Sequence, residues 1–182
     1  MTKKQIALYS MMLLLAYDKG GVLQLLPDYA QRLGAPPAVV GYYLAFCFLA
    51  LTVGTFAGPL VARRAADLRP IFLAIGLVKV PVIFMHGHVN NVGQLIALNG
   101  LDWFLCGVIA SLIPICVGLL AGANERGRLF GIIASASALG AMVGSLMGGA
   151  LIAPFGYSGL FTAFALTACA LPLAAFLMAP VS

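Results

Sequence analysis

Charged residues are scarce in this chain. Only 8% of its 182 residues are Asp, Glu, Lys or Arg, while 63% are hydrophobic. Water-soluble domains usually carry about 25% charged residues. The few charges fall mostly between long apolar runs and not inside them. Such a chain has too little polar surface for water, which excludes a soluble globular domain and indicates a protein whose solvent is the lipid bilayer.

Motifs that carry catalytic or cofactor chemistry are also missing. The sequence has no His-Glu-x-x-His, no Gly-x-Ser-x-Gly and no phosphate-binding glycine loop that ends in Lys-Ser/Thr. The four cysteines lie in apolar runs without metal-ligand spacing, and they are Cys47, Cys106, Cys116 and Cys169. The basic residues are divided among separate loops, unlike a nucleic-acid patch. We therefore expect no enzyme, no cofactor, no metal and no nucleic-acid partner.

Six apolar stretches are long enough to cross a bilayer as helices, which takes about 20 residues each. They are Gln5–Leu26, Val39–Ala62, Ile71–Met85, Gly93–Ala121, Leu129–Ala153 and Ser158–Ala179. Gly, Pro and charged residues occupy the linkers. Asp18-Lys19-Gly20-Gly21 interrupts the first stretch, so we expect a broken helix there. The prediction is an all-α membrane protein, with residues 1–182 forming a single bundle of six transmembrane helices.

The distribution of Lys and Arg predicts the orientation of the bundle. With a cytoplasmic N-terminus, that side carries all the basic loop residues except Arg32, namely Lys3, Lys4, Arg63, Arg64, Arg69, Arg126 and Arg128. Short cytoplasmic loops are enriched in Lys and Arg. Both termini should therefore face the cytoplasm, in a multi-pass protein of the cell membrane and, most simply, of a bacterial inner membrane.

Glycines recur at helical spacing in two of the spans. Gly140, Gly144 and Gly148 lie on one face of the fifth span, and Gly54 and Gly58 form a shorter version in the second. Small residues let helices approach closely in lipid. Both helices are the second of a triplet, so residues 1–90 and 91–182 are expected to form two three-helix repeats of inverted orientation, an arrangement typical of secondary transporters.

Several segments resemble one half of a major facilitator superfamily transporter. The most similar stretch is 124–128, followed by the glycine-rich helix and Phe155-Gly156-Tyr157. Residues 26–34 resemble the end of the family's first helix, and residues 58–64 resemble its Gly-x-Leu-x-Asp-Arg loop with Ala62 at the acidic position. The resemblance implies a six-helix half in which the first and fourth helices border a central solute cavity.

Charged residues at membrane depth are costly and mark candidate functional sites. By helical rise, Asp18 and Asp102 lie at nearly the same level, just outside the midplane. Lys79 reaches that level from the third span, and a Lys79–Asp102 pair would neutralise two buried charges. This pair is either a structural link between spans three and four or part of a coupling site.

Proton coupling is the mechanism that these carboxylates suggest. Asp18 is the first candidate for the proton carrier because the sequence offers it no evident opposite charge, and Asp102 is the second. Gln24 and Asn99 could bond a solute or a neighbouring helix. His86 and His88 are expected in a solvated loop, since a third metal ligand is missing.

Two functions remain open at this point. The first is a secondary active transporter half-unit that moves a small solute, coupled to protons, and needs a second half from a homodimer or a partner membrane chain. The alternative is a non-transporting integral membrane subunit that docks in a larger complex through its glycine-rich helix faces.

Overall fold

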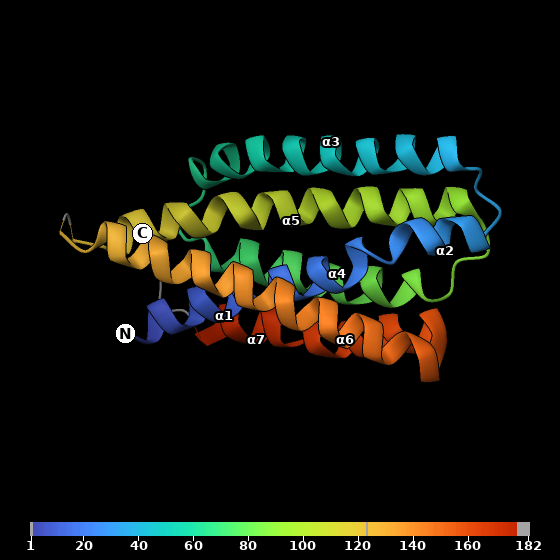
Figure 1. Ribbon diagram of the computed structural model, residues 1–182. Coiled ribbons are helices and arrows are strands. Elements are labelled where there is room, and N and C mark those ends of the chain that lie inside the picture. The colour runs from blue at the N-terminus through green and yellow to red at the C-terminus, as the bar shows by residue number, and fades with distance from the viewer. Residues whose placement is uncertain (1, 123, 178–182) are drawn as a thin grey trace.

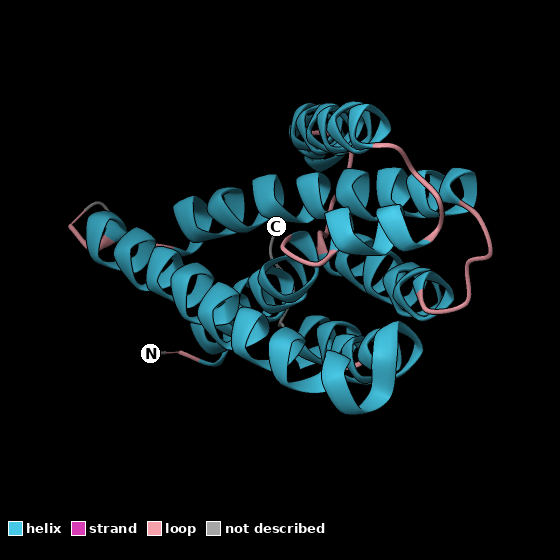
Figure 2. Ribbon diagram, turned by 45° about the vertical axis from the view of Figure 1, so that its right-hand side comes forward, coloured by secondary structure: helices cyan, strands magenta, loops and turns pink. Residues whose placement is uncertain are grey.

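The computed structural model describes residues 2–122 and 124–177, and in these residues all regular structure is helical. The helices are α1 (Lys3–Leu23), α2 (Leu26–Arg32), α3 (Pro37–Ala62), α4 (Arg69–His86), α5 (Val92–Leu120), α6 (Arg126–Ala168) and α7 (Ala170–Leu177). They form an elongated bundle in which α1 begins and α7 ends toward the same end (Figure 1). Short loops join the helices (Figure 2). The predicted all-helical class is confirmed, and the last residues of the sixth predicted span, up to Ala179, lie outside the described part.

Five helical segments are long and apolar enough to cross a membrane, and the last of them extends over 51 residues, Arg126–Phe176. A straight helix of that length would measure about 75 Å. However, Gly144 and Phe164 both contact Gly21, so the chain must reverse between them. The reversal lies at Gly156, whose φ of 63° is left-handed and favours glycine. The segment therefore makes two passes, and residues 3–177, apart from residue 123, cross the bundle six times.

The break that we predicted at Asp18-Lys19-Gly20-Gly21 is wrong, because α1 is helical through this stretch and ends at Leu23. Gly20 and Gly21 provide close approach instead of an unwound turn. A Cβ on Gly20 would collide with the backbone of Ala141, and one on Gly21 would meet the carbonyl oxygen of Gly144. The chain leaves the helix at Gln24 and Leu25 and continues as α2.

The predicted glycine faces hold the bundle together. On α6, added Cβ atoms at Gly140 and Gly144 would meet the carbonyl oxygens of Leu13 and Tyr17 on α1. The second face follows the same principle, since an added Cβ at Gly54 on α3 would meet the backbone of Phe104 on α5. Gly58 meets Val108 and Ser111 on α5, and Gly148 meets Gly21 on α1. The α1–α6 and α3–α5 pairs are accordingly the most extensive helix contacts in the bundle.

Apolar side chains cover much of the outer surface. Helix α3 lies at the edge of the bundle in both views (Figures 1 and 2), with Tyr42 and Phe56 about three-quarters exposed. On α6, Leu146 and Phe155 are exposed in the same way, and Leu166 is exposed beyond the reversal. In water such a surface would drive aggregation, whereas in a bilayer it is matched to the surrounding acyl chains. The exterior agrees with the multi-pass membrane class predicted from composition.

Candidate functional site

Four charged side chains form one network inside the bundle. The Lys79 ammonium on α4 donates to Asp18 Oδ2 at 3.1 Å and makes a short contact with Asp102 Oδ1. The Lys19 ammonium makes a short contact with the other carboxylate oxygen of Asp102. The order is Lys19–Asp102–Lys79–Asp18, with no net charge. Burial of separate ions would be costly, and this pairing offsets that cost.

The structure brings Lys79 and Asp102 together as the depth argument predicted. It also corrects one premise, because Asp18 does have an opposite charge beside it, namely Lys79. Asp18 and Lys19 point in different directions, as neighbours on a helix must, and each takes a different partner. The exposed fractions of Asp18, Lys79 and Asp102 are 5%, 1% and 4%, so these three residues are buried.

The network lies where two apolar clusters meet. On α1, the cluster at the N-terminal end of the bundle extends to Leu15, and the other cluster begins at Tyr17. On α5, the same boundary falls between Trp103 and Leu105. Asp18 and Asp102 sit at these boundaries, which supports the prediction that the two carboxylates share one depth. The network therefore has apolar packing on both sides.

A groove of about 300 Å³ opens beside Lys19. It is formed by α1, α3, α5 and α6, through Met12, Leu15, Ala16, Lys19, Gly20, Leu23, Leu51, Cys106, Ala110, Ser137 and Ala141. Lys19 is the single charged residue among these lining residues. Its side chain is 20% exposed, whereas that of Asp102 behind it is 5% exposed. The groove therefore presents the network to the outside through one ammonium group.

Aromatic and sulfur groups complete the surroundings of the network. The Lys19 Nζ lies 4.6 Å from the ring centroid of Trp103, a cation–π arrangement. The Trp103 indole nitrogen is buried and has no hydrogen-bond partner in the described structure. The Cys106 sulfur lies 3.1 Å from Lys79 Nζ. Asp18, Asp102 and Cys106 are close enough to suggest a metal site, but the Lys79 ammonium already contacts all three.

The remaining predicted site residues lie elsewhere. Asn99 is buried, but its Nδ2 donates to the Leu95 carbonyl oxygen of its own helix at 3.2 Å. Gln24 is exposed at the C-terminal end of α1 and has no part in the network. Sequence reasoning missed Lys19 and Cys106 as neighbours of Lys79 and Asp102. The spacing of Cys106, four residues after Asp102 and thus on the same helix face, is a signal that could have found it.

The prediction for His86 is wrong, because this residue is buried and does not lie in a solvated loop. It is the last residue of α4, its Nδ1 lies 2.6 Å from the Val82 carbonyl oxygen, and its ring stacks on Phe161 at 5.2 Å. The Tyr29 hydroxyl donates to the His86 carbonyl oxygen at 2.9 Å. His88 is exposed as expected. His86 therefore acts in packing at the end of the bundle far from the N-terminus.

Tyr29 belongs to a polar contact that ties α2 to the reversal in α6. The Tyr157 hydroxyl donates to Asp28 Oδ2 at 2.5 Å, and Arg32 Nε donates to the same oxygen at 2.9 Å. The Tyr29 and Tyr157 rings stack with centroids 4.0 Å apart. The hydrogen bond from Tyr157, with the nearby Arg32 charge, lowers the pKa of the Asp28 carboxyl below its ordinary value. This contact closes one end of the bundle.

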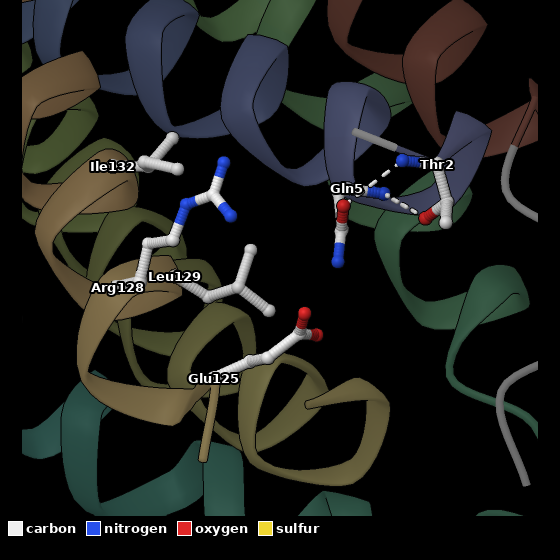
Figure 3. A pocket seen from close by; sticks show the side chains of 6 residues that line it. All are labelled: Thr2, Gln5, Glu125, Arg128, Leu129 and Ile132. Atoms are coloured by element: carbon white, nitrogen blue, oxygen red, sulfur yellow. Dashed lines mark hydrogen bonds between the residues drawn. The ribbon is translucent and has the colours of Figure 1, made fainter. Parts of the chain in front are cut away.

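The opposite end carries a polar hollow of about 350 Å³ (Figure 3), lined by Thr2, Gln5, Glu125, Arg128, Leu129 and Ile132. Thr2 and Gln5 form a capping box that starts α1, with the Thr2 amide donating to Gln5 Oε1 at 2.9 Å. Glu125 and Arg128 are exposed. Asp18 lies roughly 20 Å further along α1, so this hollow is separate from the charge network.

Membrane-length apolar helices, a buried neutral ion network and a groove opening between four helices define a multi-pass helical membrane protein. The family model of the Major Facilitator Superfamily matches residues 8–182, and the chain belongs to that family. It is 29% identical over 149 residues to the multidrug efflux pump SdrM of Staphylococcus aureus (strain N315). That alignment covers 81% of this chain and 32% of SdrM, so the chain spans about a third of the length of this relative. The predicted family is confirmed, and it is a family of transporters and not of enzymes.

Proposed function

We propose that the chain is a half-unit of a secondary active transporter that moves a small solute across the membrane. It works with a second six-helix half, supplied by a second copy or by a partner membrane chain. The main observation in support of a second half is the position of Lys19, which is a partly exposed charge at membrane depth on an open groove. A charge facing lipid costs about 2.5–3.5 kcal/mol on insertion scales. A second half over the groove removes that cost and encloses a solute cavity.

The packing supports the inverted 3+3 repeat, with residues 1–90 and 91–182 as its units. Exchange of the two repeats converts the α1–α6 contact into the α3–α5 contact, and these are the two most extensive pairs. Each pair uses the same device, glycines on the second helix of a triplet. Loop charges support cytoplasmic termini, and the staphylococcal relative supports a bacterial inner membrane.

Proton coupling is assigned to the carboxylates of the network, with Asp18 first and Asp102 second. Asp102 contacts two ammonium groups, whereas Asp18 contacts only that of Lys79 within the described network. This single cationic contact distinguishes Asp18 from Asp102 and makes it the first candidate. A cavity of about 10 Å³ next to Asp18 and Lys79 offers room for roughly one water molecule.

Gradient-driven transport tests this function and the Asp18 role together. The purified full chain, with its second half, is placed in proteoliposomes under an inward proton gradient, and movement of cationic, neutral and anionic fluorescent dyes is measured. We expect movement of at least one dye class, and Asp18→Asn should lose the gradient dependence. Glu125→Gln, an exposed residue outside the network, is the control. Unchanged coupling in Asp18→Asn removes that residue's role, and absence of gradient-driven movement overturns the transport proposal.

The alternative function is a docking subunit that binds a partner through its glycine faces. The packing of these faces argues against it. Gly140, Gly144 and Gly148 are already packed on α1, and Gly54 and Gly58 are packed on α5. These faces are therefore used within the chain and are not available to another protein.

A further inference from the structure

We propose that the solute of this groove is an organic anion with an apolar body, and that its anionic group binds the ammonium of Lys19. The proposal rests on the transport function above and names its substrate class. A groove of about 300 Å³ is at the lower end of the range for small-molecule sites. Its walls are mainly apolar, through Leu15, Leu23 and Leu51, with Lys19 as the charged group among the described lining residues.

The arrangement of charges favours an anion over a cation. Asp18 and Asp102 lie behind the lysines, and both are buried. Asp102 carries Lys19 on one carboxylate oxygen and Lys79 on the other. A cation entering the groove meets the ammonium of Lys19 first and is repelled. An anion meets the same ammonium and is attracted.

Lys19 can turn to a solute without leaving a carboxylate unpaired. If Lys19 moves from Asp102 to a bound anion, Asp102 still contacts Lys79, and Lys79 still contacts Asp18. The Trp103 ring centroid lies 4.6 Å from the Lys19 ammonium, which gives that ammonium a cation–π contact beside the groove. Lys79 has no such freedom, since it is 1% exposed and contacts both carboxylates.

Trp103 adds an independent observation at the same place. Its indole N–H is buried and lacks a hydrogen-bond acceptor in the described structure. Buried donors are nearly always satisfied. An anion bound at Lys19 would bring acceptor oxygens close to the Trp103 ring, whose centroid lies 4.6 Å from that ammonium.

Equilibrium binding with three matched probes tests the substrate class. The probes are 1-naphthylacetate, 1-naphthylacetamide and 2-(1-naphthyl)ethylammonium, which share one ring system and differ in charge. Binding to the full chain in detergent is measured at pH 7 without any gradient. We expect the carboxylate to bind at least tenfold more tightly than the amide, and the ammonium probe to bind most weakly.

Substitutions in the groove test which residue causes the preference for the carboxylate probe. Lys19→Gln should reduce carboxylate affinity to that of the amide and leave amide affinity unchanged, which also verifies the fold. Lys19→Arg should keep the carboxylate preference, and Lys3→Gln, at the exposed end of α1, should behave as wild type. Ala110→Phe, which fills the groove without a change of charge, should weaken all three probes.

Measurements on the wild-type chain are enough to overturn the anion assignment. Equal affinities for the three probes, or tighter binding of the ammonium probe, would do so. So would a carboxylate preference that survives Lys19→Gln, or probe affinities that survive Ala110→Phe. These failures are separate from failure of transport. Gradient-driven movement of a cationic dye with no anion binding leaves transport standing, whereas anion binding without any gradient-driven movement leaves the site standing and removes transport.

Discussion

The interior of the bundle can hold charged side chains only when they are paired with opposite charges. The four charged residues of the network there are Asp18, Lys19, Lys79 and Asp102. Each carboxylate has at least one ammonium contact, and each ammonium has at least one carboxylate contact. Removal of Lys79 leaves Asp18 without its ammonium contact, and removal of Asp102 leaves Lys19 without its carboxylate contact, which is a larger loss than the network's net contribution to stability. The network is therefore most sensitive to single substitution of these two inner members and more tolerant of paired substitutions.

Substitution of Lys79 is the clearest test of that reasoning. Lys79→Met removes the cation that contacts Asp18, and we expect the free energy of unfolding to fall by about 3–5 kcal/mol. The double variant Lys79→Met/Asp18→Asn should recover a large part of that loss, because no unpaired carboxylate remains at Asp18. Denaturant unfolding of the full chain in detergent micelles measures both values.

Lys3→Met, an exposed substitution at the start of α1, serves as the control and should stay within about 0.5 kcal/mol of wild type. A Lys79→Met chain as stable as this control would mean that Asp18 is not an ion in the folded protein.

The depth of each residue along its own helix is sufficient to predict that three of these residues lie at one level. Helical rise placed Asp18, Lys79 and Asp102 at one level, and the structure joins them. The contact of Lys19 with Asp102 was missed, because it depends on how α1 and α5 are rotated about their axes. Rotation is set by packing between helices and is not contained in the hydropathy of either helix. Gln24 was predicted at the site for its polarity alone and lies outside it.

The helices themselves were largely predictable, and their ends less so. The predicted second and fourth spans agree with α3 and α5 to within about two residues. The first span was misread, because Gly20 and Gly21 beside two charges resemble a helix break. Their contacts with α6 explain the difference, since glycine in a membrane helix also allows close packing against another helix. Gly156, by contrast, does reverse the chain.

A matched pair of glycines on α6 tests this packing role. Gly144→Ala should lower the free energy of unfolding by about 1–3 kcal/mol, because the new methyl group would collide with the Tyr17 carbonyl oxygen. Gly149→Ala should be neutral or stabilising by up to about 1 kcal/mol, since no atom lies within 4 Å of its Cβ and alanine favours the helix. Unfolding in micelles measures both, and equal effects would contradict close packing of α1 on α6.

At the scale of the whole molecule, exposed apolar faces lie beside a groove that contains the charge of Lys19. The exposed apolar residues of α3 and α6 are suited to acyl chains or to another apolar protein surface. The groove is different, because Lys19 opens into it and hydrocarbon cannot stabilise an ammonium group. One bundle alone in lipid would therefore have an unfavourable contact, and in our proposal a second half removes it by enclosing a cavity that water can enter.

Access of water to the groove tests whether a second half covers it. In a chain whose native cysteines are replaced by serine or alanine, Ser137→Cys places a thiol on the groove wall, and Leu173→Cys places one on the apolar exterior. The two positions lie at similar depth, because each is roughly 25–30 Å along its pass from the reversal at Gly156. We expect a charged, water-borne thiosulfonate reagent to modify the cysteine at 137 in membranes and not the one at 173. Native mass in mild detergent should then show two six-helix halves, either two copies or this chain with a partner. A single chain at every concentration, with both positions unreactive, would mean that the groove faces lipid and that the half-unit proposal is wrong.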